Sequence, residues 1–292
     1  MPAVLTERIG HVLVVTLNRP DRMNAINGEV LVRFYDAMVE ADTDDDIRVA
    51  IITGAGDNFC AGADLKEMAG GHQGEDLSGV DVQGRLAADP DLPWKALLRT
   101  WRPNVPLITA AEGHAIAGGT ELTGATEIRV AGESARFGIS EVRWSLYAMG
   151  GSVVRIPRQI PYTVAAELLL TGDHIDAQRA LQLGLVGHVV PDGQALAKAL
   201  EIAERIAANG PLAVKAILRT LRETNGMVES DALDHEFTYG WDVFAVRGRQ
   251  GGPPRLQGEA NPQVPRAVAH LTETSYPGGQ WPRSTTPAFS VL

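Results

Sequence analysis

Residues 113–141 read GHAIAGGTELTGATEIRVAGESARFGISE. A short run at 127–131 (EIRVA) lies between glycine-rich borders, which is typical of a strand entered and left by tight turns. Two acids frame this run, Glu121 on the turn before it and Glu141 beyond it. A Gly-rich backbone that can present bare N–H groups, followed by two carboxylates, suits chemistry beside a polarised carbonyl.

A second glycine-alanine stretch lies upstream at 59–65, FCAGADL. Gly62 and Ala63 are small enough for a ligand to approach the main chain, and a helix that begins within ADLKEM has free N–H groups in its first turn. Gly118 and Gly119 provide the same at the end of a strand, so donors from two loops can meet on one oxygen. Such a pair stabilises an enolate, and losing one donor costs about 3 kcal/mol of barrier. Either loop alone is equally compatible with ordinary turn glycines.

Strand and helix patterns alternate outward from these loops. Residues 11–17 (HVLVVTL), 49–53 (VAIIT) and 106–110 predict strands, and residues 29–41 predict an amphipathic helix between the first two. Beyond Ser152 the pattern turns helical, at 164–170, 176–183, 194–208 and from 211 to 223. The order predicts the α/β class, with one α/β domain and a helical C-terminal extension.

The expected organisation has three parts: an α/β core at 1–190, a helical region at 191–245, and an atypical Pro/Gly-rich tail at 246–292 that we expect to be extended or disordered. Residues 70–91 lack a sustained apolar period and are interpreted as a surface loop.

Composition narrows the function classes. Lys and Arg number 26 against 36 Asp and Glu, a formal net charge of -10 that repels nucleic acid and anionic membranes. The single cysteine, Cys60, excludes an intrachain disulfide and any CxxC metal or redox motif. No basic start followed by an apolar stretch and no membrane-length apolar run occurs. We expect a cytoplasmic protein without a metal site that binds neither nucleic acid nor membrane.

Four separated motifs appear in order: FCAGADLKEM, GHAIAGGTEL, ARFGISEVRWSLYAMGG and LLLTGDHIDAQRALQLGLVGHVV. Together they resemble the successive signatures of the enoyl-CoA hydratase (crotonase) superfamily, over roughly residues 5–244. The motif sequence WSLYAMGG is most similar to that of actinobacterial members. The resemblance implies a crotonase-type spiral of ββα units and a homotrimer or dimer of trimers. It also implies a coenzyme A thioester substrate, no separate cofactor, and a place in fatty acid or lipid metabolism.

The resemblance also implies roles for individual residues. The backbone N–H groups of Ala63 and Gly118 would form the oxyanion hole for the thioester oxygen. Glu121 would deprotonate a water that attacks the β-carbon, and Glu141 would deliver a proton to the α-carbon, which describes a hydro-lyase. The two carboxylates need different protonation states, and the sequence leaves open which one holds the proton at rest.

The loop at 61–66 is where the family binds coenzyme A. A lysine suits a phosphate as a point charge, although a solvated helix lysine is an equally good interpretation of Lys66. The residues implied to bind CoA or substrate are Ala61, Asp64, Leu65 and Lys66.

Many hydratases have a glycine where this chain has Met149, within Tyr147-Ala148-Met149-Gly150-Gly151. A flexible thioether there reshapes the acyl pocket, which we expect Trp144 and Tyr147 to line with it. Ordinary core packing of both aromatic residues remains the alternative. The three residues suggest a substrate other than a short straight-chain enoyl group.

The tail departs further from the family pattern. Residues 248–264 read GRQGGPPRLQGEANPQV, and a set of codons for them, read one base later, gives DAKEGPRAFKEKRTPK, which is similar to the usual family ending. We hypothesise that a frameshift replaced the ending from near Val246 onward. Sequencing the locus tests this, because DNA unable to encode that ending in the shifted frame would exclude it.

Three alternatives to a hydratase stay open. One is an enoyl-CoA isomerase or another acyl-CoA enzyme of the superfamily, and one is a dehydratase run in the opposite direction. The third is a non-catalytic member, either a scaffold or RNA-binding derivative, which the acidic charge disfavours, or a chain disabled by its altered tail.

Overall fold

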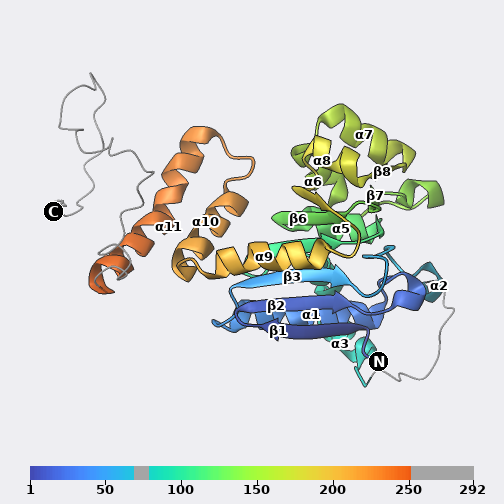
Figure 1. Ribbon diagram of the computed structural model, residues 1–292, viewed down its shortest axis with the longest axis horizontal. Helices are drawn as coiled ribbons and strands as arrows, with labels where there is room; N and C mark the ends of the chain where they lie inside the picture. The colour runs from blue at the N-terminus through green and yellow to red at the C-terminus, as the bar shows by residue number, and fades with distance from the viewer. Residues whose placement is uncertain (69–78, 251–292) are drawn as a thin grey trace. The chain divides into compact units, whose positions relative to one another are not determined.

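The computed structural model describes residues 1–68 and 79–250 (Figure 1). The chain divides into two units, Met1–Ala245 and Val246–Leu292, and the description that follows concerns the first. Most of the Pro/Gly-rich tail, which the frameshift hypothesis concerns, lies outside the described residues.

A six-stranded sheet forms the centre, in the order β1-β2-β3-β4-β6-β9. β1 and β2 form an antiparallel hairpin, and every later neighbour is parallel. The middle strands β2, β3 and β4 are buried along nearly their whole length, as expected for strands covered on both faces. The strands are β1 Val4–Ile9, β2 Val12–Leu17, β3 Val49–Gly54, β4 Leu107–Ala111, β6 Ile128–Gly132 and β9 His188–Val190.

A three-stranded sheet, β5-β7-β8, lies beside the large one and consists of β5 His114–Ile116, β7 Arg136–Gly138 and β8 His174–Asp176. The chain passes from a strand of the large sheet to one of the small sheet and then into a helix, first as β4-β5-α5 and again as β6-β7-α6. This repetition confirms the spiral of ββα units. Cys60 extends the small sheet by a bridge to Ala115, which brings the 59–65 loop to the start of α5.

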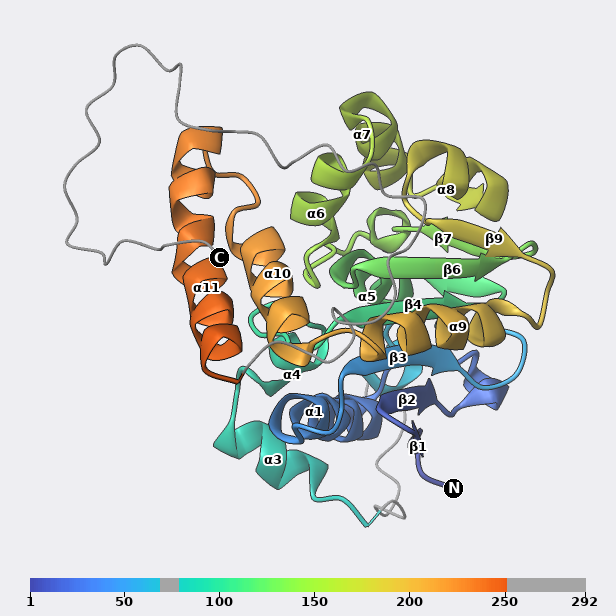
Figure 2. The ribbon, with the colours of Figure 1, turned by 60° about the vertical axis from the view of Figure 1, so that its left-hand side comes forward.

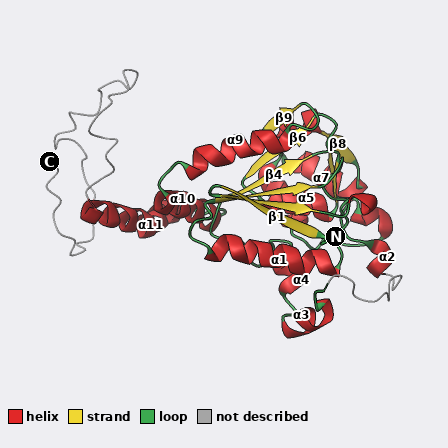
Figure 3. Ribbon diagram, turned by 60° about the horizontal axis from the view of Figure 1, so that its bottom comes forward, coloured by secondary structure: helices red, strands yellow, loops and turns green. Residues whose placement is uncertain are grey.

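Helices cover both faces of the large sheet. α1 (Gly28–Thr43) packs through Val30, Phe34 and Met38 on one face, while α9 (Ala195–Ala207) packs through Ala199 and Ala203 on the other. Figure 3 shows the two helices on opposite sides of the strands. α9 opens the region expected at 191–245, so that region shares its hydrophobic core with the α/β part.

Of the remaining helices, α3 and α4 pack against α1, and the others lie around the small sheet, beside the 59–65 loop or at the C-terminal end. Residues 82–88, expected within a surface loop, form the helix α3, because Asp81 caps it by accepting a hydrogen bond from Gly84 N at 2.8 Å. The helices are α2 Leu65–Met68, α3 Val82–Ala88, α4 Leu92–Ala96, α5 Gly118–Ala125, α6 Ser152–Gln159, α7 Tyr162–Thr171, α8 Ala177–Leu183, α10 Pro211–Glu223 and α11 Glu229–Gln250. α11 continues to residue 250, so the start of the region expected to be extended is helical.

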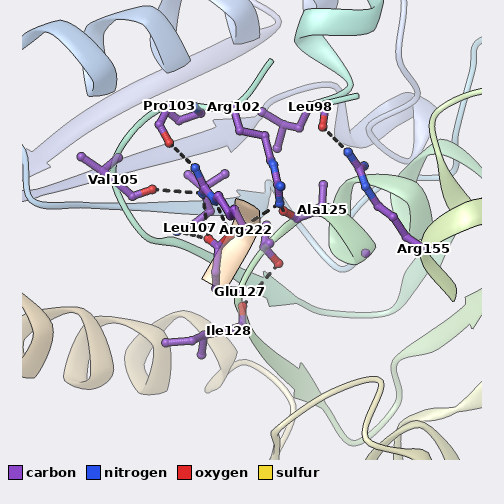
Figure 4. Close-up of polar contacts among 12 residues, drawn as sticks. Leu98, Arg102, Pro103, Val105, Leu107, Ala125, Glu127, Ile128, Arg155 and Arg222 are labelled. Carbon is purple, nitrogen blue, oxygen red and sulfur yellow. Dashed lines mark hydrogen bonds and ion pairs between the residues drawn. The ribbon is translucent and has the colours of Figure 1, made fainter. Parts of the chain in front are cut away.

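A half-buried ion pair ties α10 to the end of the sheet (Figure 4). Arg222 donates from Nε and Nη2 to the two oxygens of Glu127, at 2.9 and 3.1 Å, and from Nη1 to the Pro103 carbonyl at 2.7 Å. Glu127 also accepts from Leu107 N at 3.0 Å, and Arg102 lies 3.7 Å from it. α10 and α11 lie side by side, linked by Arg219 and Tyr239 at 3.1 Å (Figure 2).

Candidate active site

Two backbone N–H groups, those of Ala63 and Gly118, face a common space. A Cβ placed on Gly118 would lie 3.9 Å from Ala63 N and 3.5 Å from the Gly62 Cα. Neither N–H donates a hydrogen bond to any residue that the structure describes. Two adjacent unpaired donors of this kind can hold one carbonyl oxygen and stabilise negative charge on it.

The close approach of the two loops depends on small residues and on an unusual backbone. Gly62 has φ +90°, and a Cβ there would lie 2.7 Å from the Ala117 Cβ. Ala117, the N-cap of α5, has φ 52° and ψ -120°, a conformation that costs a residue with a side chain about 1–3 kcal/mol and is typical of functional sites. The small residues at this strained turn let the start of α5 lie close to the 59–65 loop.

Glu121 belongs to the first turn of α5 and is only 4% exposed. Its Oε1 accepts two hydrogen bonds from Ser152, one from the backbone N at 3.2 Å and one from Oγ at 2.8 Å. Its Oε2 faces Gly150, where an added Cβ would collide with that oxygen and lie 2.7 Å from Cδ. Oε2 is therefore the oxygen left to act on a ligand.

Glu141 begins a short 3-10 helix, Glu141–Trp144, and lines the same cavity. Its Oε2 is buried and has no hydrogen-bond partner among the described residues. Burial raises the pKa of Glu141 to about 7, and the nearby charge of Glu121 adds to the shift. At neutral pH a substantial fraction of Glu141 therefore carries a proton. The different environments fit an acid at Glu141 and a base at Glu121.

One cavity of about 680 Å³ is lined by both glutamates, Ala63 and Gly118. Trp144, Tyr147 and Met149 also line it, as the sequence suggested, and they stand exposed at its rim instead of packing in the core. The rest of the wall is largely apolar and includes Ile26, Leu31, Trp94, Leu97 and Leu146.

The four residues expected to bind coenzyme A separate into two groups. Ala61, Asp64 and Leu65 line the cavity. Lys66 is exposed, lies outside that lining, and donates no hydrogen bond to a described residue.

The Asp64 carboxylate is engaged within the protein. It accepts from Arg19 Nη2 at 2.9 Å. Burial would raise the pKa of Asp64, but the hydrogen bond and charge of Arg19 outweigh it and lower the pKa. The ion pair with Arg19 therefore fixes the Asp64 side chain within the loop.

Sequence reasoning missed Ser152 and the wall formed by α4. Ser152 was noted only as the point beyond which the pattern turns helical, although the first residues of a helix present free backbone N–H groups. Trp94 and Leu97 belong to the apolar run LPWKALL at 92–98, which lay beside a segment interpreted as loop.

The described residues contain no group of three or more His, Cys, Asp or Glu side chains placed to hold a metal ion. None of their helices combines the length and apolar character needed to cross a membrane.

Comparison with known proteins agrees with this geometry. The model of the enoyl-CoA hydratase/isomerase family matches residues 7–256. The chain is 53% identical to enoyl-CoA hydratase EchA19 of Mycobacterium tuberculosis over 252 residues. This alignment covers 86% of this chain and 92% of the relative. It is 35% identical to the 2,3-dehydroadipyl-CoA hydratase of Escherichia coli, over 81% of this chain and 88% of the relative.

A solved structure shows the same architecture. The crystal structure of an enoyl-CoA hydratase from Mycobacterium tuberculosis H37Rv superposes with a TM-score of 0.74 at 39% identity, covering 87% of this chain and 98% of that one. The sequence match, the ββα spiral and the two-acid cavity agree, and the chain belongs to the enoyl-CoA hydratase/isomerase family.

Proposed function

We propose that this chain is a hydro-lyase that adds water reversibly across the double bond of a 2-enoyl-CoA thioester, giving a 3-hydroxyacyl-CoA. One observation carries the proposal: Glu121 and Glu141 line the same cavity as the N–H groups of Ala63 and Gly118. The two acids differ in environment, since Glu121 accepts hydrogen bonds from Ser152, whereas Glu141 Oε2 is buried without a partner among the described residues. An oxyanion hole alone would serve many thioester reactions, whereas a base and an acid together fit the addition of water.

In the proposed reaction the thioester oxygen accepts hydrogen bonds from Ala63 N and Gly118 N, which makes the β-carbon electrophilic. Glu121 Oε2 removes a proton from water, and the resulting hydroxide bonds to the β-carbon. The enolate then takes the proton of Glu141 at the α-carbon, in a syn addition. Afterwards Glu121 carries a proton and Glu141 is ionised, so exchange with solvent restores the starting state. Acid-base groups of this kind each contribute roughly 10²–10⁴-fold.

The apolar wall supports an acyl group larger than a short straight chain as the substrate. Trp144, Tyr147 and Met149 would line the acyl end, while Ala61, Leu65 and Lys66 would lie along the coenzyme A part, Lys66 reaching a phosphate. Coenzyme A is part of the substrate, and the proposed chemistry uses no cofactor, since protein groups supply both the acid-base steps and the charge stabilisation.

A homotrimer or dimer of trimers is the proposed assembly. Each of seven large apolar side chains on α10 and α11 is at least half exposed, and such a surface is rarely left uncovered in a soluble protein; the seven are Leu212, Ile217, Leu221, Leu233, Phe237, Trp241 and Phe244. Light scattering of the purified chain tests this, since a monomer mass would contradict it. We propose a cytoplasmic location, supported by the single cysteine, which is buried as a free thiol, and a role in lipid metabolism.

The test follows the loss of enoyl thioester absorbance with crotonyl-CoA and with a bulkier 2-enoyl-CoA, for the parent chain, Glu121→Gln and Glu141→Gln. We expect turnover by the parent and a loss of at least a hundredfold in each variant. Activity indifferent to both substitutions would overturn the two-acid mechanism. Conversion of a 3-enoyl-CoA to its 2-isomer without hydration would favour an isomerase, and saturable CoA binding without turnover would favour a non-catalytic protein.

A further inference from the structure

The segment from Gly150 to Ser152 forms a cradle around the carboxylate of Glu121. Ser152 is 1% exposed and directs both its backbone N–H and its hydroxyl at the same oxygen, Oε1. Gly150 approaches Oε2 so closely that no side chain fits there. One oxygen of the carboxylate is thus fixed by two donors, and the other lies next to a bare backbone.

We propose that Ser152 is the positioning residue for the base of the reaction: its hydroxyl holds Glu121 Oε1 so that Oε2 alone takes the proton from water. The inference rests on the base role proposed for Glu121. The χ3 torsion of a glutamate has a broad, roughly two-fold energy profile, so rotation about it exchanges the two carboxylate oxygens. Unless one oxygen is held in place, either of them could face the water. Bonding Oε1 at 2.8 Å removes that freedom before substrate binds.

Arg155, three residues beyond Ser152 on α6, donates to two backbone carbonyls, one of them in the turn that precedes Ser152. Arg155 Nη2 donates to the Leu98 carbonyl at 2.5 Å and Nη1 to the Gly150 carbonyl at 3.4 Å. Figure 4 shows the Arg155 side chain directed at Leu98. Arg155 therefore links Gly150, which lines the cavity, to Leu98, the residue after the lining residue Leu97. Ser152 therefore acts from a rigid support, as a positioning residue requires.

Two titratable groups interact electrostatically with Glu121. Glu141 lines the same cavity, and Arg155 on α6 is the nearby cation; burial lowers the pKa of Arg155 to about 10 while Glu121 acts to raise it. Ser152 is the only residue among those described whose hydrogen bond to the Glu121 carboxylate is found. Removing its hydroxyl leaves the backbone N–H as the remaining donor, so the expected effect is partial.

The test compares Ser152→Ala and Ser152→Thr with a matched control, Thr123→Val. Thr123 carries a buried hydroxyl on the same helix as Glu121, and it donates to the Gly119 carbonyl at 2.9 Å without touching the carboxylate. Steady-state hydration is measured from acid to alkaline pH, and the melting temperature of each variant is recorded beside it.

We expect Ser152→Ala to lower kcat about 10- to 100-fold, the effect of one hydrogen bond to a charged group, with KM little changed. The acid limb of its pH profile should move upward by about one unit. Ser152→Thr, which keeps the hydroxyl, should recover most of kcat, and Thr123→Val should keep the parent profile.

An unchanged kcat and pH profile in Ser152→Ala would overturn the inference, and so would equal losses in Ser152→Ala, Ser152→Thr and Thr123→Val. Glu121→Gln measured in parallel separates this failure from a failure of the proposed function. If Glu121→Gln abolishes turnover while Ser152→Ala leaves it intact, the positioning role alone is wrong. If Glu121→Gln is fully active, both the base role of Glu121 and the positioning role of Ser152 are wrong.

Discussion

Substituting Gly62 by alanine tests whether the two N–H groups act as a pair. The new Cβ would lie 2.7 Å from the Ala117 Cβ and 3.2 Å from Gly118 N. The first separation is about 0.8 Å shorter than the roughly 3.5 Å at which carbon atoms pack, and the neighbour is backbone-bound, so the loop and the α5 turn must move apart. An oxygen that needs donors at about 2.7–3.1 Å then loses one of them, and kcat should fall about 10²- to 10³-fold.

Gly193 provides the matched control. It has φ +79° and open space around it, so Gly193→Ala introduces the same backbone strain away from the cavity. Both variants should lose roughly 1–3 kcal/mol of stability, measured by urea unfolding, but only Gly62→Ala should lose hydration activity. A kcat for Gly62→Ala within a fewfold of the parent would refute the paired oxyanion hole.

Three further outcomes follow from the site and its support. The kcat/KM of hydration and of dehydration should both fall as pH rises through about 7, because the active form carries one proton on the pair of Glu121 and Glu141; a flat profile from pH 6 to 9 would contradict this. Gly150→Ala should abolish turnover, since its Cβ would displace the Glu121 carboxylate, whereas retained activity would show that this carboxylate is dispensable. Arg222→Met should lower stability by about 1–3 kcal/mol in urea titrations, against less than about 1 for Arg219→Met at an exposed pair; equal losses would refute the anchoring of α10.

Sequence patterns predicted the elements whose periodicity is set by burial on the sheet. The strand expected at 11–17 is β2 and the helix expected at 29–41 is α1, because both present apolar faces to one core. β1 was missed because five of its six residues are exposed at the sheet edge, so no apolar alternation marks it. β5, β7, β8 and β9, at three residues each, are too short to carry a period and are set by tertiary contacts.

The sequence motifs identified Ala63, Gly118, Glu121 and Glu141 as candidate site residues, and the fold brings all four to one cavity. The raised pKa of Glu141 could not be predicted, because it follows from the burial of its carboxylate in the folded chain. The engagement of Asp64 by Arg19, from another part of the chain, was equally invisible. The frameshift near Val246 stays a prediction about residues outside the described part.

The central claim is that Glu121 and Glu141 add the elements of water across the double bond of a 2-enoyl-CoA held by Ala63 N and Gly118 N. Its most direct test is hydration of a 2-enoyl-CoA in D2O, with the product examined by NMR. The account predicts one deuterium at the α-carbon, syn to a new hydroxyl at the β-carbon. A product without the β-hydroxyl, or with the deuterium anti to it, would contradict the account.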